Sequence, residues 1–169
     1  GCSLNARSLV VGRQASTRGI DGTATHAGRE PPPGEHPRDA TLGRVVDLLD
    51  ARYPPSTAED WDAVGLVVGD PQRRVRRVLF AVDPVADVVD EAVAWGADLV
   101  VTHHPLLLKG VHSVAATTVK GSVVHRLVEA GCALYVAHTN GDAAERGVND
   151  ALADLLGIVD RRPLDPHEP

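Results

Sequence analysis

The sequence predicts an α/β fold, with a mostly parallel sheet and flanking helices. Short aliphatic runs alternate along the chain with segments of helical hydrophobic spacing, which is the order expected of strand–helix–strand units. Apolar residues make up 43% of the chain and aromatic residues only 3%, and a core built mainly from Val, Ala and Leu suits buried parallel strands. The length of 169 residues corresponds to about one domain.

The first part of the chain differs from the rest. Residues 1–39 are rich in Gly, Arg, Ser, Thr and Pro and show no hydrophobic period, so we expect a disordered arm. A helix is expected behind Thr41 as its N-cap, and it ends before Pro54. Within residues 58–69, an acidic turn leads into a short glycine-bounded strand, and we interpret Trp61 in this turn as a packing anchor rather than a stacking platform.

Residues 40–160 are expected to form one α/β lobe, followed at residues 161–169 by a polar tail or the start of a linker. After the first helix and strand, the elements alternate. They are a strand at 75–82, a helix at 85–95, a strand that ends at His103, an irregular loop at 106–118, a helix at 121–130, a strand at 132–137 and a helix at 143–156. Because strands joined by two consecutive crossovers of this kind run parallel, their carboxyl ends meet at one edge of the sheet.

Charge and composition narrow the classes of function. The net charge of −6 and the lack of a long Lys/Arg block argue against nucleic acid as a partner, and the short basic run at 73–77 is interpreted as a solvated entrance to a strand. No apolar run approaches the ~20 residues that a membrane-spanning helix needs. Cys2 and Cys132 form no disulfide framework, so we expect a reducing, cytoplasmic location.

Polar residues gather where two of the expected strands end. His103 and His104 follow one strand, and His138 and Asp142 follow the next. Three imidazoles and a carboxylate at one sheet edge are the ligand types that Zn²⁺, Fe²⁺ or Mn²⁺ bind, and a carboxylate can bridge two ions. The alternative is that these histidines are structural and are held by hydrogen bonds. The residues themselves leave both interpretations open.

Five motifs in order resemble a known family. They are Glu59-Asp60-Trp61-Asp62 with Gly65-Leu66, then Val82-Asp83-Pro84, then His103-His104-Pro105, then His138-Thr139-Asn140-Gly141-Asp142, and then Gly147-Val148-Asn149-Asp150. Over about residues 41–160 the chain resembles the GTP cyclohydrolase I type 2-like family, also known as interacting-factor-three-like dinuclear-metal proteins. The resemblance implies the N-terminal lobe of a two-lobed subunit that assembles into a homohexameric ring.

The resemblance also implies a site. In the complete protein two divalent ions (Zn, Fe or Mn) would be bound, with His103, His104 and Asp142 among the ligands and His138 beside the metals as the catalytic candidate. A further His and Glu of the family lie far downstream, and we assign that role to neither His167 nor Glu168. The chain is therefore expected to be an N-terminal fragment with an incomplete site.

The implied activity is that of a hydrolase. The family name points to a small-molecule substrate, GTP, whose imidazole ring would be opened by hydrolysis. A generic metal-dependent phosphoesterase would use the same ligands. The alternative from another class is a non-catalytic metal-binding or regulatory protein-interaction module.

Overall fold

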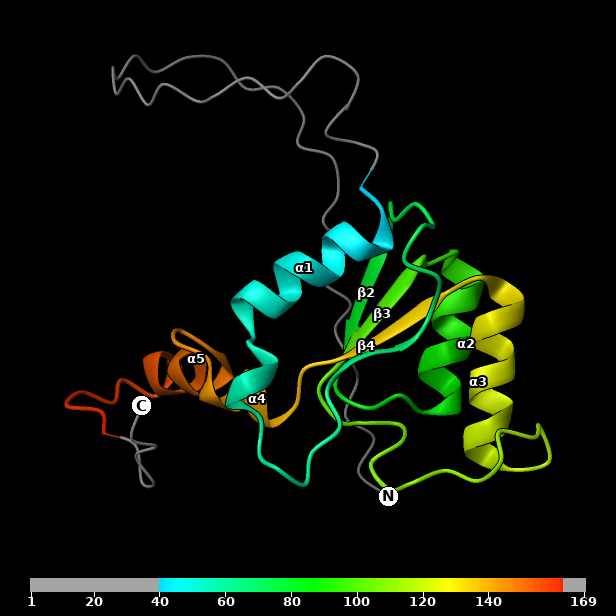
Figure 1. Cartoon of the computed structure of the whole chain (residues 1–169). Helices are drawn as coiled ribbons and strands as arrows, with labels where there is room; N and C mark the ends of the chain where they lie inside the picture. Colours follow the sequence, from blue (N-terminus) through cyan, green and yellow to red (C-terminus); the bar gives the residue numbers. More distant parts are fainter. Residues whose placement is uncertain (1–39, 163–169) are drawn as a thin grey trace, which may run out of the picture.

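The structure, a computed structural model, describes residues 40–162. The predicted arm at 1–39 and residues 163–169 of the predicted tail lie outside the described residues. The described part is a four-stranded sheet between two layers of helices. Helices α2 and α3 lie side by side on one face, and α1 packs on the other (Figure 1). The predicted α/β fold with a mostly parallel sheet and flanking helices is confirmed.

The strands are β1 (Gly65–Val68), β2 (Val78–Ala81), β3 (Leu99–Thr102) and β4 (Ala133–Val136). The helices are α1 (Leu42–Arg52), α2 (Ala86–Trp95), α3 (Val119–Ala130), α4 (Thr139–Ala143) and α5 (Val148–Leu155), and a single 3₁₀ turn, η1 (Pro55–Thr57), follows α1. Among residues 40–162, none of these helices has the length and apolar character needed to cross a membrane.

The sheet has the strand order β1-β4-β3-β2. Strands β2, β3 and β4 run parallel, whereas β1, the outermost strand beside β4, pairs antiparallel with it. Ala81 pairs with Thr102, and Thr102 pairs with Val136, so the three parallel strands end level with one another. The residues that follow these strands therefore emerge together at one edge of the sheet, as the strand–helix–strand pattern predicts.

The core is divided by the sheet into two buried clusters. Val100 and Leu134 lie in the cluster with α2 and α3, whereas Leu99 and Tyr135 lie in the cluster with α1. The Tyr135 hydroxyl donates a hydrogen bond to Asp50 Oδ1 of α1 at 2.7 Å. Because β3 and β4 are buried throughout, they form a rigid support for the residues at their carboxyl ends.

Local signals explain where the helices begin and end. The hydroxyls of Thr41 and Thr118 accept hydrogen bonds from backbone N–H groups in the first turns of α1 and α3. Gly96 and Gly131 adopt left-handed backbone, with φ of 72° and 63°, at the ends of α2 and α3. A residue with a Cβ is disfavoured in that conformation, so glycine ends both helices.

The predicted final helix at 143–156 is wrong in its extent. The chain instead enters α4 at Thr139, separated from the end of β4 by two residues, then turns and forms α5. Arg146 between the two helices has a positive φ of 56°. The Arg52 guanidinium of α1 donates to the carbonyl oxygens of Glu145 and Arg146 at 2.6 and 2.7 Å. These contacts satisfy carbonyl groups that a continuous helix would have used.

The predicted strand at 75–82 is shorter in the structure, where β2 covers Val78–Ala81. The N–H groups of Arg76 and Arg77 donate to the Asp98 carboxylate at 2.8 and 2.9 Å instead of joining the sheet. The backbone of the basic run is thus held at the entrance to the strand, and its arginine residues are exposed.

Candidate metal centre

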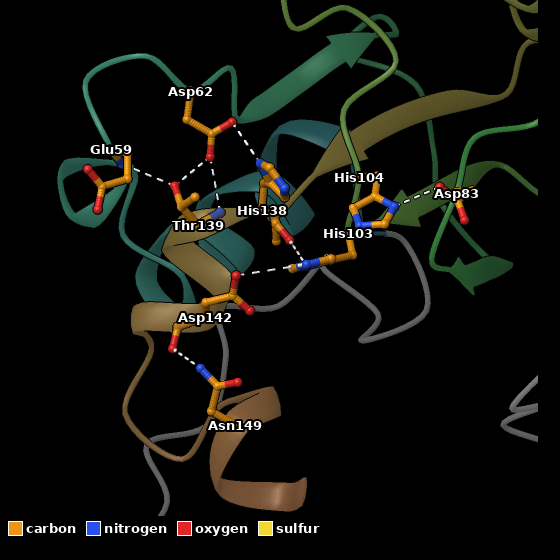
Figure 2. Close-up of polar contacts among 10 residues, drawn as sticks. Glu59, Asp62, Asp83, His103, His104, His138, Thr139, Asp142 and Asn149 are labelled. Atoms are coloured by element: carbon orange, nitrogen blue, oxygen red, sulfur yellow. Dashed lines mark hydrogen bonds and ion pairs between the residues drawn. The ribbon is translucent and has the colours of Figure 1, made fainter. Parts of the chain in front are cut away.

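Three histidine side chains converge at the carboxyl edge of the sheet. His103 and His104 follow β3 directly, and His138 follows β4 after one residue. Each ring offers a nitrogen within 4.8 Å of a nitrogen of the other two. The ring centroid of His103 lies 5.0 Å from that of His104 and 5.1 Å from that of His138. Figure 2 shows the three rings gathered between the strand ends and α4.

Each imidazole is oriented through its Nδ1 atom. His103 Nδ1 lies 3.1 Å from the Ala137 carbonyl oxygen, His104 Nδ1 lies 2.6 Å from Asp83 Oδ1, and His138 Nδ1 lies 2.9 Å from Asp62 Oδ1 (Figure 2). A carbonyl or an ionised carboxylate only accepts hydrogen bonds, so in each neutral ring Nδ1 carries the proton. The lone pair of each ring is therefore on Nε2, which is the state that a metal-binding histidine needs.

Asp142 brings a carboxylate to the same place. It lies on α4, and its Oδ2 atom is 3.9 Å from His103 Nε2 (Figure 2). The Asn149 amide donates to the Asp142 backbone carbonyl at 3.1 Å, which joins this end of α4 to α5. A separation of 3.9 Å is too long for a hydrogen bond, so this carboxylate oxygen is not bonded to the ring and would be one further donor for a divalent ion.

Asp62 is the most constrained carboxylate of the site. Its side chain is completely buried and accepts four hydrogen bonds, from the His138 ring, the Ala63 N–H, and the Thr139 N–H and hydroxyl. Burial by itself raises the pKa of Asp62, but the hydrogen bonds from Thr139, His138 and Ala63 outweigh it and lower the pKa to about 2. Asp62 is therefore ionised at neutral pH and fixes the His138 ring.

The loop that carries Asp62 also positions an aromatic residue that the sequence interpretation placed wrongly. Trp61 is 59% exposed, so it is not a packing anchor. Its ring lies 6.0 Å from the His138 ring, centroid to centroid, at an interplanar angle of 80°. The acidic turn binds to polar groups of α4 rather than to the apolar core, and this leaves the indole at the surface beside the histidines.

Sequence reasoning found the four converging residues but not the groups that orient them. His103, His104, His138 and Asp142 lie together, as expected from strand ends at one sheet edge. Asp62 and Asp83 received no role, although both lie within motifs on which the family resemblance rests. Their position inside those motifs was the signal that could have identified them as functional residues.

The donor set fits a divalent ion. Three imidazoles with free Nε2 atoms and one carboxylate are ligands typical of Zn²⁺, Fe²⁺ and Mn²⁺. The carboxylates of Asp62, Asp83 and Asp142 surround the rings and make the electrostatic potential of the site favourable for a cation. Structural histidines would also be held through Nδ1, but that role alone does not require three imidazoles with a ring nitrogen of each within 4.8 Å of the others.

The fold and this cluster define an α/β protein with a candidate metal centre at the carboxyl edge of its sheet. The chain belongs to the Duf34/NIF3 (NGG1p interacting factor 3) family, whose model matches residues 40–168. The resemblance inferred from the five sequence motifs is thereby confirmed.

Proteins with similar sequences carry a name that matches the family inferred from the five motifs. A GTP cyclohydrolase 1 type 2 homolog of Streptomyces coelicolor is 58% identical over 130 residues, which cover 76% of this chain and 46% of the relative. A protein of the same name from Mycobacterium tuberculosis is 51% identical over 125 residues, with coverage of 74% and 32%.

Solved structures of other proteins are similar to this chain in fold. A Bacillus cereus protein related to NIF3 superposes with a TM-score of 0.73 at 34% identity, covering 78% of this chain and 36% of that one. Reduced HcgD from Methanocaldococcus jannaschii gives a TM-score of 0.68 at 32% identity, with coverage of 74% and 50%. This chain therefore spans half or less of the length of each of these four relatives.

Proposed function

We propose that this chain is the metal-binding lobe of a metal-dependent hydrolase. The observation that carries the proposal is the convergence of three imidazoles, each held through Nδ1 so that its Nε2 lone pair is free. His103, His104 and Asp142 are the proposed ligands on this chain. Two ions held in fixed geometry need more ligands than these, and the family resemblance implies that a downstream His and Glu supply them.

The chain's own residues suit proton transfer beside the metals. A bound divalent ion supplies Lewis acidity, which polarises a substrate oxygen and makes water nucleophilic near neutral pH. The His138 Nε2 atom has a free lone pair and accepts a proton, while Nδ1–H remains bonded to Asp62. The ionised Asp62 carboxylate then stabilises the imidazolium that forms, as a carboxylate does behind a catalytic histidine in hydrolases. His138 is thus the proposed general base and Asp62 its positioning residue.

The proposed substrate follows from the names of the relatives. They refer to GTP cyclohydrolase, so we propose hydrolytic opening of the imidazole ring of GTP by the complete protein, assembled as a homohexameric ring. The second candidate is a non-catalytic metal-binding or regulatory module. It is supported by the same histidine cluster, because a group of imidazoles can bind an ion whether or not a reaction follows.

Calorimetric titration of the chain with Zn²⁺ or Mn²⁺ tests the metal site. Replacing His104 or Asp142 by Ala should weaken binding by more than the ~10–100-fold typical of losing a group that only orients a ligand. His125→Ala is the matched control, because His125 lies exposed on α3. Equal affinity of the wild type and His104→Ala, or no binding by the wild type, would disprove the proposal.

GTP turnover separates the two candidate functions. Residues 1–169 alone should turn over GTP slowly or not at all, since His103, His104 and Asp142 are too few ligands to hold two ions in fixed geometry. A version extended by the downstream portion of the Streptomyces relative should turn over GTP, and His138→Ala in that version should reduce kcat. Metal binding without turnover in the extended version would favour the non-catalytic module. Tight binding of two ions with rapid turnover by the chain itself would contradict the incomplete site.

A further inference from the structure

The loop before β1 is fixed on both sides of Trp61. The Glu59 N–H donates to the Thr139 hydroxyl at 3.0 Å, and the Asp62 carboxylate accepts hydrogen bonds from the Thr139 N–H and hydroxyl (Figure 2). Both anchors hold the loop to the first residue of α4. The backbone of Trp61 is therefore held in position, although its side chain is 59% exposed.

The exposed indole borders the candidate metal centre. Its ring lies 6.0 Å from the His138 ring at an angle of 80°. His138 in turn lies 5.1 Å from His103 and 5.7 Å from His104, between ring centroids. A perpendicular contact between two rings covers little area, so most of the indole remains available to a ligand that enters the site.

The charges around Trp61 indicate which part of a ligand it would contact. Its sequence neighbours, Asp60 and Asp62, are both acidic. Acidic groups repel a phosphate chain but not an uncharged planar ring. Exposed aromatic side chains next to catalytic groups bind such rings by stacking, because every nucleobase has a π face.

We propose that Trp61 is a specificity-determining residue that stacks on the planar heteroaromatic ring of the ligand, a purine nucleoside or nucleotide, and holds this ring next to His138. The assignment rests on the function proposed above and names the part of the substrate that this side of the site recognises. It also explains why a large apolar side chain is kept at the surface on a firmly anchored loop.

Intrinsic fluorescence gives a direct test, because the chain has two tryptophans. The other, Trp95, ends α2 and contacts the Arg77 guanidinium near the start of β2, at the opposite edge of the sheet. In Trp95→Phe, Trp61 is the remaining tryptophan. Guanosine should change its emission saturably, and tripolyphosphate should not.

Calorimetry with guanosine measures the contribution of the indole. Trp61→Ala should bind guanosine about tenfold or more weakly than the wild type, Trp61→Phe should retain most of the affinity, and the matched control Trp95→Ala should bind as the wild type does. Absence of guanosine binding by the wild type, or equal affinity in Trp61→Ala, would overturn the proposal. Emission from Trp61 that changes with protein concentration alone would also overturn it, since a second copy would then cover the indole.

A parallel titration with Zn²⁺ keeps the two proposals distinguishable. Trp61→Ala should bind Zn²⁺ as tightly as the wild type does, because the indole supplies no ligand atom. Zn²⁺ binding together with guanosine binding that does not depend on Trp61 would overturn the stacking role alone. Trp61-dependent guanosine binding by a wild type that binds no Zn²⁺ would overturn the metal function alone.

Discussion

Replacing Asp62 by Asn is expected to lower the free energy of unfolding by about 2 kcal/mol at pH 7. The amide has nearly the shape of the carboxylate but only one accepting oxygen. Its NH₂ group would face donors that now bond to the carboxylate, either those of Thr139 or those of Ala63 and His138. At least one buried donor would thus lose its partner.

The magnitude follows from the pKa of Asp62. Folding lowers this pKa from its ordinary value of 3.8 to about 2. At about 1.4 kcal/mol per pH unit, the ionised carboxylate contributes about 2 kcal/mol to stability. Since the pKa is depressed in the folded state, the contribution is fully present above about pH 5, falls by about half near pH 3, and is lost as the pH falls through 2.

Urea denaturation at several pH values, in the presence of a chelator, measures this effect without a contribution from metal. The stability difference between the wild type and Asp62→Asn should be greatest at pH 5–7 and should shrink towards pH 2. Asp83→Asn is the matched control, because Asp83 also accepts from a histidine Nδ1 but is 54% exposed, so its pair should contribute less than about 1 kcal/mol. A difference for Asp62→Asn that is near zero at pH 7, or that does not change with pH, would refute the reasoning.

Other predictions concern packing and metal affinity. Tyr135→Phe removes the hydroxyl that donates to Asp50 and should destabilise the chain by about 1–3 kcal/mol in urea, and an unchanged midpoint would contradict this. Gly121→Ala should cost about 1–3 kcal/mol, because a Cβ there would lie 1.9 Å from the Ala115 carbonyl oxygen. Gly141→Ala should be neutral or slightly stabilising, since its Cβ would meet Ala137 Cβ at 3.6 Å, and equal losses in the two glycine variants would be inconsistent with the packing. Zn²⁺ affinity should be lower at pH 5.5 than at pH 7.5, because protons compete with the metal for the imidazole nitrogens, and equal affinity at the two pH values would argue against histidine ligands.

The sequence by itself determined most of the elements, although not the division of the last helix into α4 and α5 or the start of β2. Thr41 and Thr118 as caps, Gly96 and Gly131 as helix ends and the aliphatic runs of β3 and β4 all act through neighbours a few residues away. Because parallel strands in consecutive crossovers end at one edge, the same local patterns also brought His103, His104, His138 and Asp142 together.

Only the tertiary structure decided how these residues are held. Asp62 and His138 are 76 positions apart, and no local pattern pairs a buried carboxylate with one particular ring. The antiparallel pairing of β1 brings the loop with Asp62 and Trp61 beside α4, and the Arg52 contacts stabilise the turn that separates α4 from α5. Hydrogen bonds between distant segments form only once the core has packed, so the exposure of Trp61 and the orientation of the histidines depend on the whole fold.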